Sequence, residues 1–189
     1  MGNRRLGRKR LYGIEKEGQE VDLGAGAGIS PAIARTTQHR LGQELITEIV
    51  VDLGSSAATG TILGGGGAEQ IIGIAAKAAH LGQLTVAKVG VVTEIRAVMT
   101  EVPAGGAVNV DLWALASGTA VRGAAGGGGT AGPADMSAIG EDTSTTNDAN
   151  GYADLYLYLT NATGDSGGSA QTAGKLTIYI YGFAVPDDL

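Results

Sequence analysis

The 189-residue chain is predicted to be all-β, an antiparallel sandwich or jelly roll with an extended N-terminal arm. Several segments after residue 44 alternate apolar and polar side chains with the period of a half-buried strand. Clusters of Gly, Pro, Asn, Asp and Ser separate these segments, as expected of turns. The length suits one domain, so we expect residues 1–44 to form the arm and residues 45–189 the β-body.

The predicted arm has no sustained helical or strand period, and its Gly-rich stretch at residues 23–28 is too flexible to nucleate structure. Residues 1–40 hold eight basic and four acidic side chains, against five and fifteen in residues 41–189, so a basic arm precedes an acidic body. The basic residues expected to make arm contacts are Arg4, Arg5, Arg8, Lys9 and Arg10. They lack interleaved aromatic residues for base stacking, so we expect a solvated tail or docking on an acidic protein, not nucleic acid.

The body opens with a clear strand at residues 45–53. One face of this strand carries Leu45, Thr47, Ile49, Val51 and Leu53. The opposite face carries Glu48 and Asp52, which is the alternation of a strand with one buried face. Residues 68–80 fit a short helix or a buried strand equally well, and both readings stay open.

A hairpin is predicted next, from strands at residues 89–102 and 108–114. The inward residues would be Val89, Val91, Ile95, Ala97 and Met99 on the first strand and Val108, Val110, Leu112 and Ala114 on the second. Residues 103–106, Pro-Ala-Gly-Gly, would turn the chain back, because Pro fixes φ and Gly supplies positive φ.

Two last strands follow an irregular stretch at residues 117–151, at residues 152–160 and 175–183. Their inward faces would be aliphatic, and their outward faces would be aromatic. The aromatic residues are Tyr152, Tyr156, Tyr158, Tyr179, Tyr181 and Phe183. If these strands pair, the rings form one stripe, which we interpret as a subunit or capsid interface. The alternative is that residues 117–151 fold over the stripe.

Composition narrows the function. The chain has no cysteine, which excludes disulfides and thiolate chemistry. It has 33 glycines and only 17% charged residues, so we expect a surface made largely of small, uncharged residues. No apolar run reaches the length of a membrane helix and no signal core follows the basic start, so we expect a soluble, unexported protein. His39 and His80 lack carboxylates at metal-site spacing, so no metal and no cofactor are expected.

One motif resembles a catalytic signature. Gly164-Asp165-Ser166-Gly167-Gly168 matches the surroundings of the nucleophile in chymotrypsin-like serine proteases, and His80 and Asp111 precede it in the order His, Asp, Ser. Too few residues follow Ser166 to complete the second barrel of that family. We therefore interpret the motif as a loop between strands and expect no enzyme activity and no catalytic residue.

The body also resembles virion proteins of tailed phages that infect marine bacteria. The resemblance covers residues 42–184 and rests on EVPAGG at 101–106, VNVDL at 108–112, YLYLT at 156–160, TAGKL at 172–176 and YG at 181–182. It implies a capsid cement or decoration subunit on the outer shell of the head, made in the host cytoplasm. Its expected partners are the major capsid protein and copies of itself in a homotrimer, with no membrane. The alternative is a fibre-associated or receptor-binding module.

Overall fold

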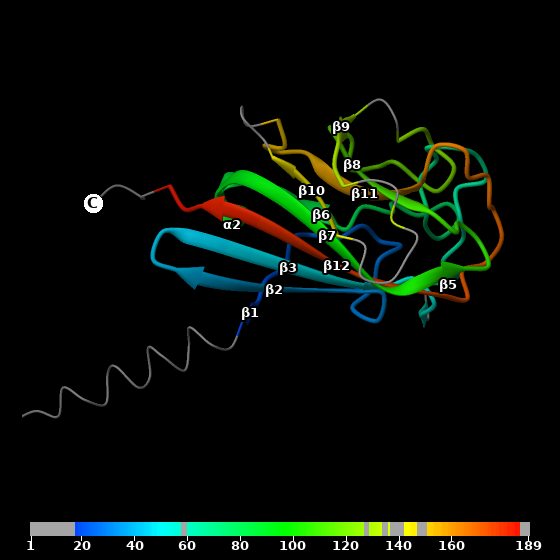
Figure 1. Ribbon diagram of the computed structural model, residues 1–189, viewed down its shortest axis with the longest axis horizontal. Helices are drawn as coiled ribbons and strands as arrows, with labels where there is room; N and C mark the ends of the chain where they lie inside the picture. Colours follow the sequence, from blue (N-terminus) through cyan, green and yellow to red (C-terminus); the bar gives the residue numbers. More distant parts are fainter. Residues whose placement is uncertain are drawn as a thin grey trace, which may run out of the picture.

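Two antiparallel β-sheets pack face to face in the computed structural model, which describes residues 18–57, 60–126, 129–133, 136, 142–146 and 151–185. The predicted all-β sandwich is confirmed (Figure 1). One sheet has the order β1-β2-β3-β12-β7-β10, and the other has the order β6-β11-β8-β9. The strands of the six-stranded sheet are β1 (Gln19–Glu20), β2 (Ala34–Leu41), β3 (Glu44–Asp52), β12 (Ala173–Phe183), β7 (Val91–Ala104) and β10 (Asp142–Thr146). Those of the four-stranded sheet are β6 (Gly82–Gln83), β11 (Tyr156–Asn161), β8 (Val110–Leu115) and β9 (Thr130–Ala131).

Two small elements complete the described structure. Strands β4 (Ser56–Ala57) and β5 (Gly60–Thr61) pair with each other, and α2 (Val86–Val89) is a single helical turn before β7. Its last residue, Val89, is buried in the core. Gly90 follows with φ +72°, a conformation that glycine adopts without strain and that redirects the chain into β7.

The six-stranded sheet buries one face, as the alternation of its long strands predicts. In β3 the residues of the predicted inward face are all buried, whereas Glu48 and Asp52 are only half-buried on the opposite face. The same alternation holds in β12, where Leu176, Ile178 and Ile180 are fully buried. These inward side chains meet Val110, Leu112, Ala114, Leu157 and Leu159 of the other sheet in one continuous core.

The β-body begins before the predicted boundary at residue 44. Strand β2 pairs with β3 over its whole length, from Ala34 opposite Val51 to Leu41 opposite Glu44. Gln38 of β2 donates hydrogen bonds to the Lys88 carbonyl (2.6 Å) and to Thr47 Oγ1 (2.9 Å). Leu23 and Ile33 also lie in the core. Residues 18–44 are therefore part of the sandwich, and residues 1–17 lie outside the described chain.

The predicted hairpin of β7 and β8 is wrong. β7 pairs with β12 and β10 in the six-stranded sheet, whereas β8 pairs with β11 and β9 in the four-stranded sheet. The connection at residues 105–109 carries the chain across the core from one sheet to the other, with Ala107 fully buried in the corner. Val108, predicted inward, lies on this connection and is exposed.

Residues 68–80 form neither the helix nor the regular strand considered above. They run irregularly beside β11, with backbone hydrogen bonds from Ile72 N to Leu159 O and from Ile71 N to Ala124 O, both 2.9 Å. Ile71 and Ala79 are buried against Tyr158 on the side of β11 away from the core, together with Ala120 and Ala124. This arrangement covers the outer face of the four-stranded sheet.

Candidate interaction face

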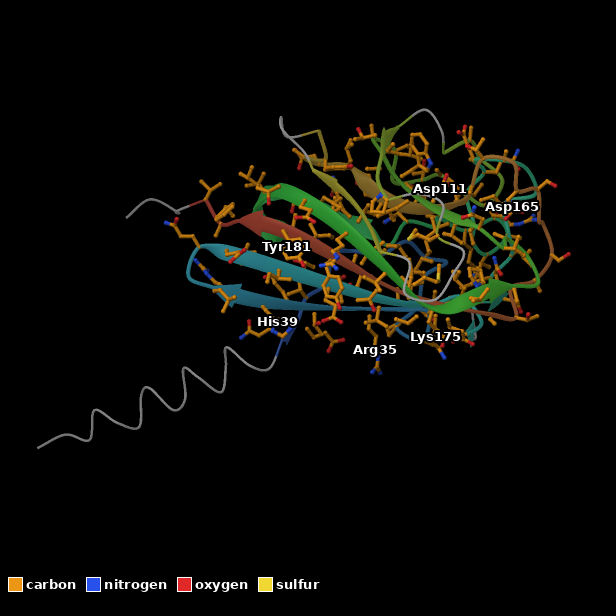
Figure 2. The ribbon with its side chains drawn as sticks, in the orientation of Figure 1. Arg35, His39, Asp111, Asp165, Lys175 and Tyr181 are labelled. Atoms are coloured by element: carbon orange, nitrogen blue, oxygen red, sulfur yellow. The ribbon has the colours of Figure 1, made fainter. Side chains whose placement is uncertain are left out.

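The outer face of the six-stranded sheet is the strongest candidate for a functional surface. We call it the open face and define it by the outward side chains of β3, β12 and β7. They are Glu44, Ile46, Glu48, Val50 and Asp52 of β3, Lys175, Thr177, Tyr179, Tyr181 and Phe183 of β12, and Val91, Glu94, Arg96, Val98 and Glu101 of β7. The part of the chain that the structure describes places no element over them, and Figure 2 shows Tyr181, Lys175, Arg35 and His39 along this sheet.

Apolar side chains on this face are unusually accessible. Phe183 is 51% exposed and Val50 is 43% exposed, and at the end of the neighbouring strand Leu41 is 53% exposed. A solvated sheet face normally alternates polar outward residues with apolar inward ones. Apolar groups clustered on one exposed face are typical of surfaces that contact another protein.

Charged residues flank the central ring of the open face. Tyr179 pairs in register with Glu48 of β3 on one side and with Arg96 of β7 on the other. Partial burial, and next the Glu48 carboxylate, raise the pKa of the Tyr179 hydroxyl above its ordinary value, while Arg96 acts in the opposite direction. The face therefore carries a negative and a positive group on opposite sides of one aromatic row.

An ion cluster lies at one end of the same face. The Lys175 Nζ atom is 3.1 Å from a Glu101 carboxylate oxygen and 3.6 Å from an Asp52 carboxylate oxygen. The hydrogen bond from Lys175 to Glu101, followed by the charge of Asp52, raises the pKa of the ammonium group. Because these side chains are exposed, the cluster contributes little to stability and chiefly fixes the charge pattern at this end.

The predicted aromatic stripe is wrong. β11 and β12 belong to different sheets, so their rings do not form one band. Tyr152 lies in the main core, and Tyr158 is fully buried under residues 71–79 and 115–124, as the alternative of an internal cover anticipates in part. The Tyr158 hydroxyl donates a hydrogen bond to the Ser117 carbonyl (2.6 Å), and burial raises its pKa. Only Tyr179, Tyr181 and Phe183 remain together, on the open face.

The protease-like motif lies in a loop whose residues hydrogen-bond to, and pack against, the backbone of the neighbouring connection at residues 105–109. The Asp165 carboxylate accepts hydrogen bonds from the backbone N–H groups of Val108 (2.8 Å), Asn109 (3.2 Å) and Gly167 (2.9 Å). A Cβ atom on Gly167 would lie 1.9 Å from the Gly106 carbonyl oxygen, so only glycine fits there. Ser166 is exposed. Loop packing thus explains Asp165 and Gly167 of the motif.

His80 does not form the hydrogen bonds of a catalytic triad. It is buried, and its ring packs edge-on against Tyr156 and Tyr158 at centroid distances of 4.9 and 5.9 Å. Within the described ranges, its Nδ1 atom has no hydrogen-bond partner, so the Asp–His bond that orients a triad histidine is not made there. Burial lowers the pKa of His80. Asp111 and Asp165 both lie toward the four-stranded sheet (Figure 2).

Side chains also join the glycine-rich loops at this end of the sandwich, which sequence reasoning did not anticipate. The Asn161 side chain accepts a hydrogen bond from Gly65 N (2.8 Å) and donates one to the Gly167 carbonyl (3.0 Å). Arg122 donates to the carbonyls of Gly64 (2.7 Å) and Gly168 (2.8 Å). We call this set of loops the glycine end. The runs of glycine in the sequence were the available signal, because close backbone packing requires them.

Three further results bear on the expectations for arm, metal and membrane. The basic residues from Arg4 to Arg10 lie outside the described residues. Among residues that the structure describes, no group of three or more His, Cys, Asp or Glu side chains could hold a metal ion. The described helical structure includes no segment with the length and apolar character needed to cross a membrane.

Comparison with known proteins gives no relative: the chain matches no protein-family model, no curated protein and no solved structure.

Proposed function

We propose that this chain is a non-enzymatic structural subunit of a phage virion, a cement or decoration protein that binds the major capsid protein lattice and stabilises the head. The observation that carries the proposal is the open face, an exposed sheet surface on which Tyr179, Tyr181 and Phe183 stand in line beside aliphatic and charged groups. Such a composition suits protein contact, because aromatic side chains bury large areas at low entropic cost.

The sequence resemblance supports the same role. Its similar runs include residues 156–160 and 172–176, which lie in strands of both sheets or lead into them, so the resemblance concerns the whole body. The basic N-terminal residues supply a charge opposite to that of the acidic body, which suits a tail that reaches an acidic neighbour. A structural role requires no catalytic centre.

The test compares phage particles that carry the coding sequence with particles from which it is deleted. Electron cryomicroscopy should show added density of this chain on the outer shell of the first particles, and their heads should withstand heating better. A matched variant with Tyr179→Ser and Phe183→Ser should lose occupancy on the shell while the purified protein keeps its β-structure. Absence of the chain from purified particles whose genome carries its coding sequence would contradict the proposal.

Two alternatives keep their own tests. A receptor-binding module would be favoured if residues 117–151 proved to be an exposed variable loop, but Ala120 and Ala124 of that stretch pack against Ile71, Ala79 and Tyr158. Density at a fibre and not on the shell would favour it. The serine-protease alternative is disfavoured because Asp165 hydrogen-bonds to the backbone of Val108 and Gly167. Covalent labelling of Ser166 by a serine-directed probe would support that alternative.

A further inference from the structure

We propose that a hollow between the Gly-rich segment at residues 23–28 and strand β11 binds a small hydroxylated carboxylate, such as a sugar acid. The hollow has a volume of about 440 Å³, which is in the usual range for small-molecule sites. None of its lining residues belongs to β3, β12 or β7, so it is separate from the open face. The inference goes beyond the proposed role on the phage head and does not depend on it.

The Gly-rich segment forms one wall of the hollow, because its glycines let it pack closely on residues 78–80. Gly26 and Gly28 each donate a backbone hydrogen bond of 2.9 Å to a carbonyl of that neighbouring segment. A Cβ atom on Gly26 would clash with a carbonyl oxygen there, so only glycine fits. Ala25 and Ala27 also line the hollow, and their N–H groups form no hydrogen bond within the described chain. The wall therefore leaves two backbone donors available to a ligand.

Lys88 supplies the positive charge of the hollow. Its Nζ atom lies 3.6 Å from the position that a Cβ on Gly24 would occupy, so the ammonium group lies beside the Gly-rich wall. The side chain is half-buried and forms no ion pair or hydrogen bond with a described residue. No carboxylate belongs to the lining, and Asp22, next to it in the chain, already accepts a hydrogen bond from Gly24 N (2.7 Å). Burial lowers the pKa of His80, so Lys88 is the charged group of the lining at neutral pH.

Three uncharged side chains of the lining suit the hydroxyl groups of a ligand. Tyr156 is half-buried, and its hydroxyl has no hydrogen-bond partner within the described chain. Gln83 donates its amide to the Asp154 carbonyl (3.0 Å), which leaves its side-chain oxygen as an acceptor. The Thr119 hydroxyl, 3.1 Å from Ser117 Oγ, can donate or accept. Sugar hydroxyls also act as donors and acceptors, so these groups match them.

The charge balance favours a carboxylate over a phosphate. One ammonium group neutralises one carboxylate, and hydrogen bonds between such charged groups are about twice as strong as those between neutral groups. The N–H groups of Ala25 and Ala27 offer further donors to the same oxygens. A phosphate monoester carries about 1.5 to 2 negative charges at pH 7, so part of its charge would remain unpaired beside Lys88.

An NMR titration of the ¹⁵N-labelled full chain with glucuronate at constant ionic strength tests the proposal. The amide signals of Ala25, Ala27 and Thr119 should shift and saturate at roughly millimolar ligand. Acetate lacks the sugar ring and glucose lacks the carboxylate, so each should bind about tenfold more weakly or less. Lys88→Gln should weaken glucuronate binding by about tenfold or more, because it removes the charged partner. Tyr156→Phe keeps the ring but removes one hydrogen bond, and should weaken binding about threefold.

The matched control is Lys175→Gln, which removes the same charge from the open face and should leave glucuronate binding unchanged. The spectra of the variants also show whether each one folds. Absence of saturable shifts at the hollow, equal binding of glucose and glucuronate, tighter binding of inorganic phosphate, or an unaffected Lys88→Gln variant would each overturn the proposal. These outcomes are independent of the capsid role, which the comparison of phage particles tests.

Discussion

The outer faces of the two sheets differ in burial, although a strand of each sheet directs tyrosine side chains away from the core. Tyr158 of β11 and Tyr179 of β12 both stand on the side of their sheet away from the core. Tyr158 is fully buried, whereas Tyr179 is only half-buried beside Glu48 and Arg96. The difference arises outside the strands, because residues 69–81 and 117–126 run beside β11 and pack over it.

The comparison shows that an outward tyrosine can have opposite roles. On the four-stranded sheet it extends the core, and its hydroxyl needs an internal acceptor, which the Ser117 carbonyl provides. On the six-stranded sheet it remains available for a partner. Strand alternation determines the side of the sheet on which a residue lies, but the loops determine whether that side meets water.

The largest expected effect is on stability when each ring is removed. Tyr158→Ala should lower the free energy of unfolding by about 3–5 kcal/mol, because it leaves a cavity and an unpaired Ser117 carbonyl. Tyr179→Ala should lower it by less than about 1 kcal/mol, because its ring is partly exposed. Urea denaturation followed by circular dichroism measures both. Equal losses would show that the two faces are covered alike.

A second contrast compares a glycine in the packed loops of the glycine end with a glycine in the open turn between β2 and β3. At Gly167, in the glycine end, a Cβ would meet the Gly106 carbonyl oxygen, so Gly167→Ala should cost about 3 kcal/mol or more. Gly42, in the turn between β2 and β3, has φ +67° and no atom within 4 Å of such a Cβ. Asn tolerates this conformation, so Gly42→Asn should change stability by no more than about 0.5 kcal/mol. The same denaturation series decides, and an unaffected Gly167→Ala would refute the close packing.

A smaller effect is expected from the buried His80 beside the covered face. Burial lowers its pKa below the ordinary value of 6.5, so the unfolded chain binds a proton at a higher pH than the folded chain. Stability should therefore fall as the pH drops below about 6.5 and level off below the folded-state pKa. His80→Phe should remove this part of the pH dependence in thermal unfolding between pH 7.5 and about 5.5. An identical slope in wild type and variant would contradict the account.

The sequence predicts the long strands well where one face is buried. The inward residues of β3 and β12 follow the alternation, because the core alone decides which side is apolar. It does not predict the partners of β7 and β8, since the Pro103–Gly106 turn signal is the same whether the chain returns beside its own strand or crosses to the facing sheet. Alternation carries no information on that choice.

The N-terminal boundary was missed for a different reason. The sequence of β2 is largely polar and does not show the alternation of a half-buried strand. Its inward Gln38 donates hydrogen bonds to Thr47 and to the backbone of α2, so even this inward position is polar. A signal was present at Gly42-Gln43, a two-residue connection with glycine first, which is typical of a tight hairpin. The sequence correctly placed Tyr179, Tyr181 and Phe183 on the outward side of β12, because they follow the strand alternation. It did not predict the burial of Tyr152 and Tyr158, because that burial depends on loops whose sequence has no periodicity.

The most direct test of the account is covalent footprinting of tyrosine and phenylalanine side chains by hydroxyl radicals, read by mass spectrometry on the purified chain and on phage heads that carry it. We expect Tyr152 and Tyr158 to be protected in both samples. Tyr179, Tyr181 and Phe183 should react in the purified chain and become protected on the head. Reactivity of Tyr158 equal to that of Tyr179, or no difference on the open face between the two samples, would contradict the account.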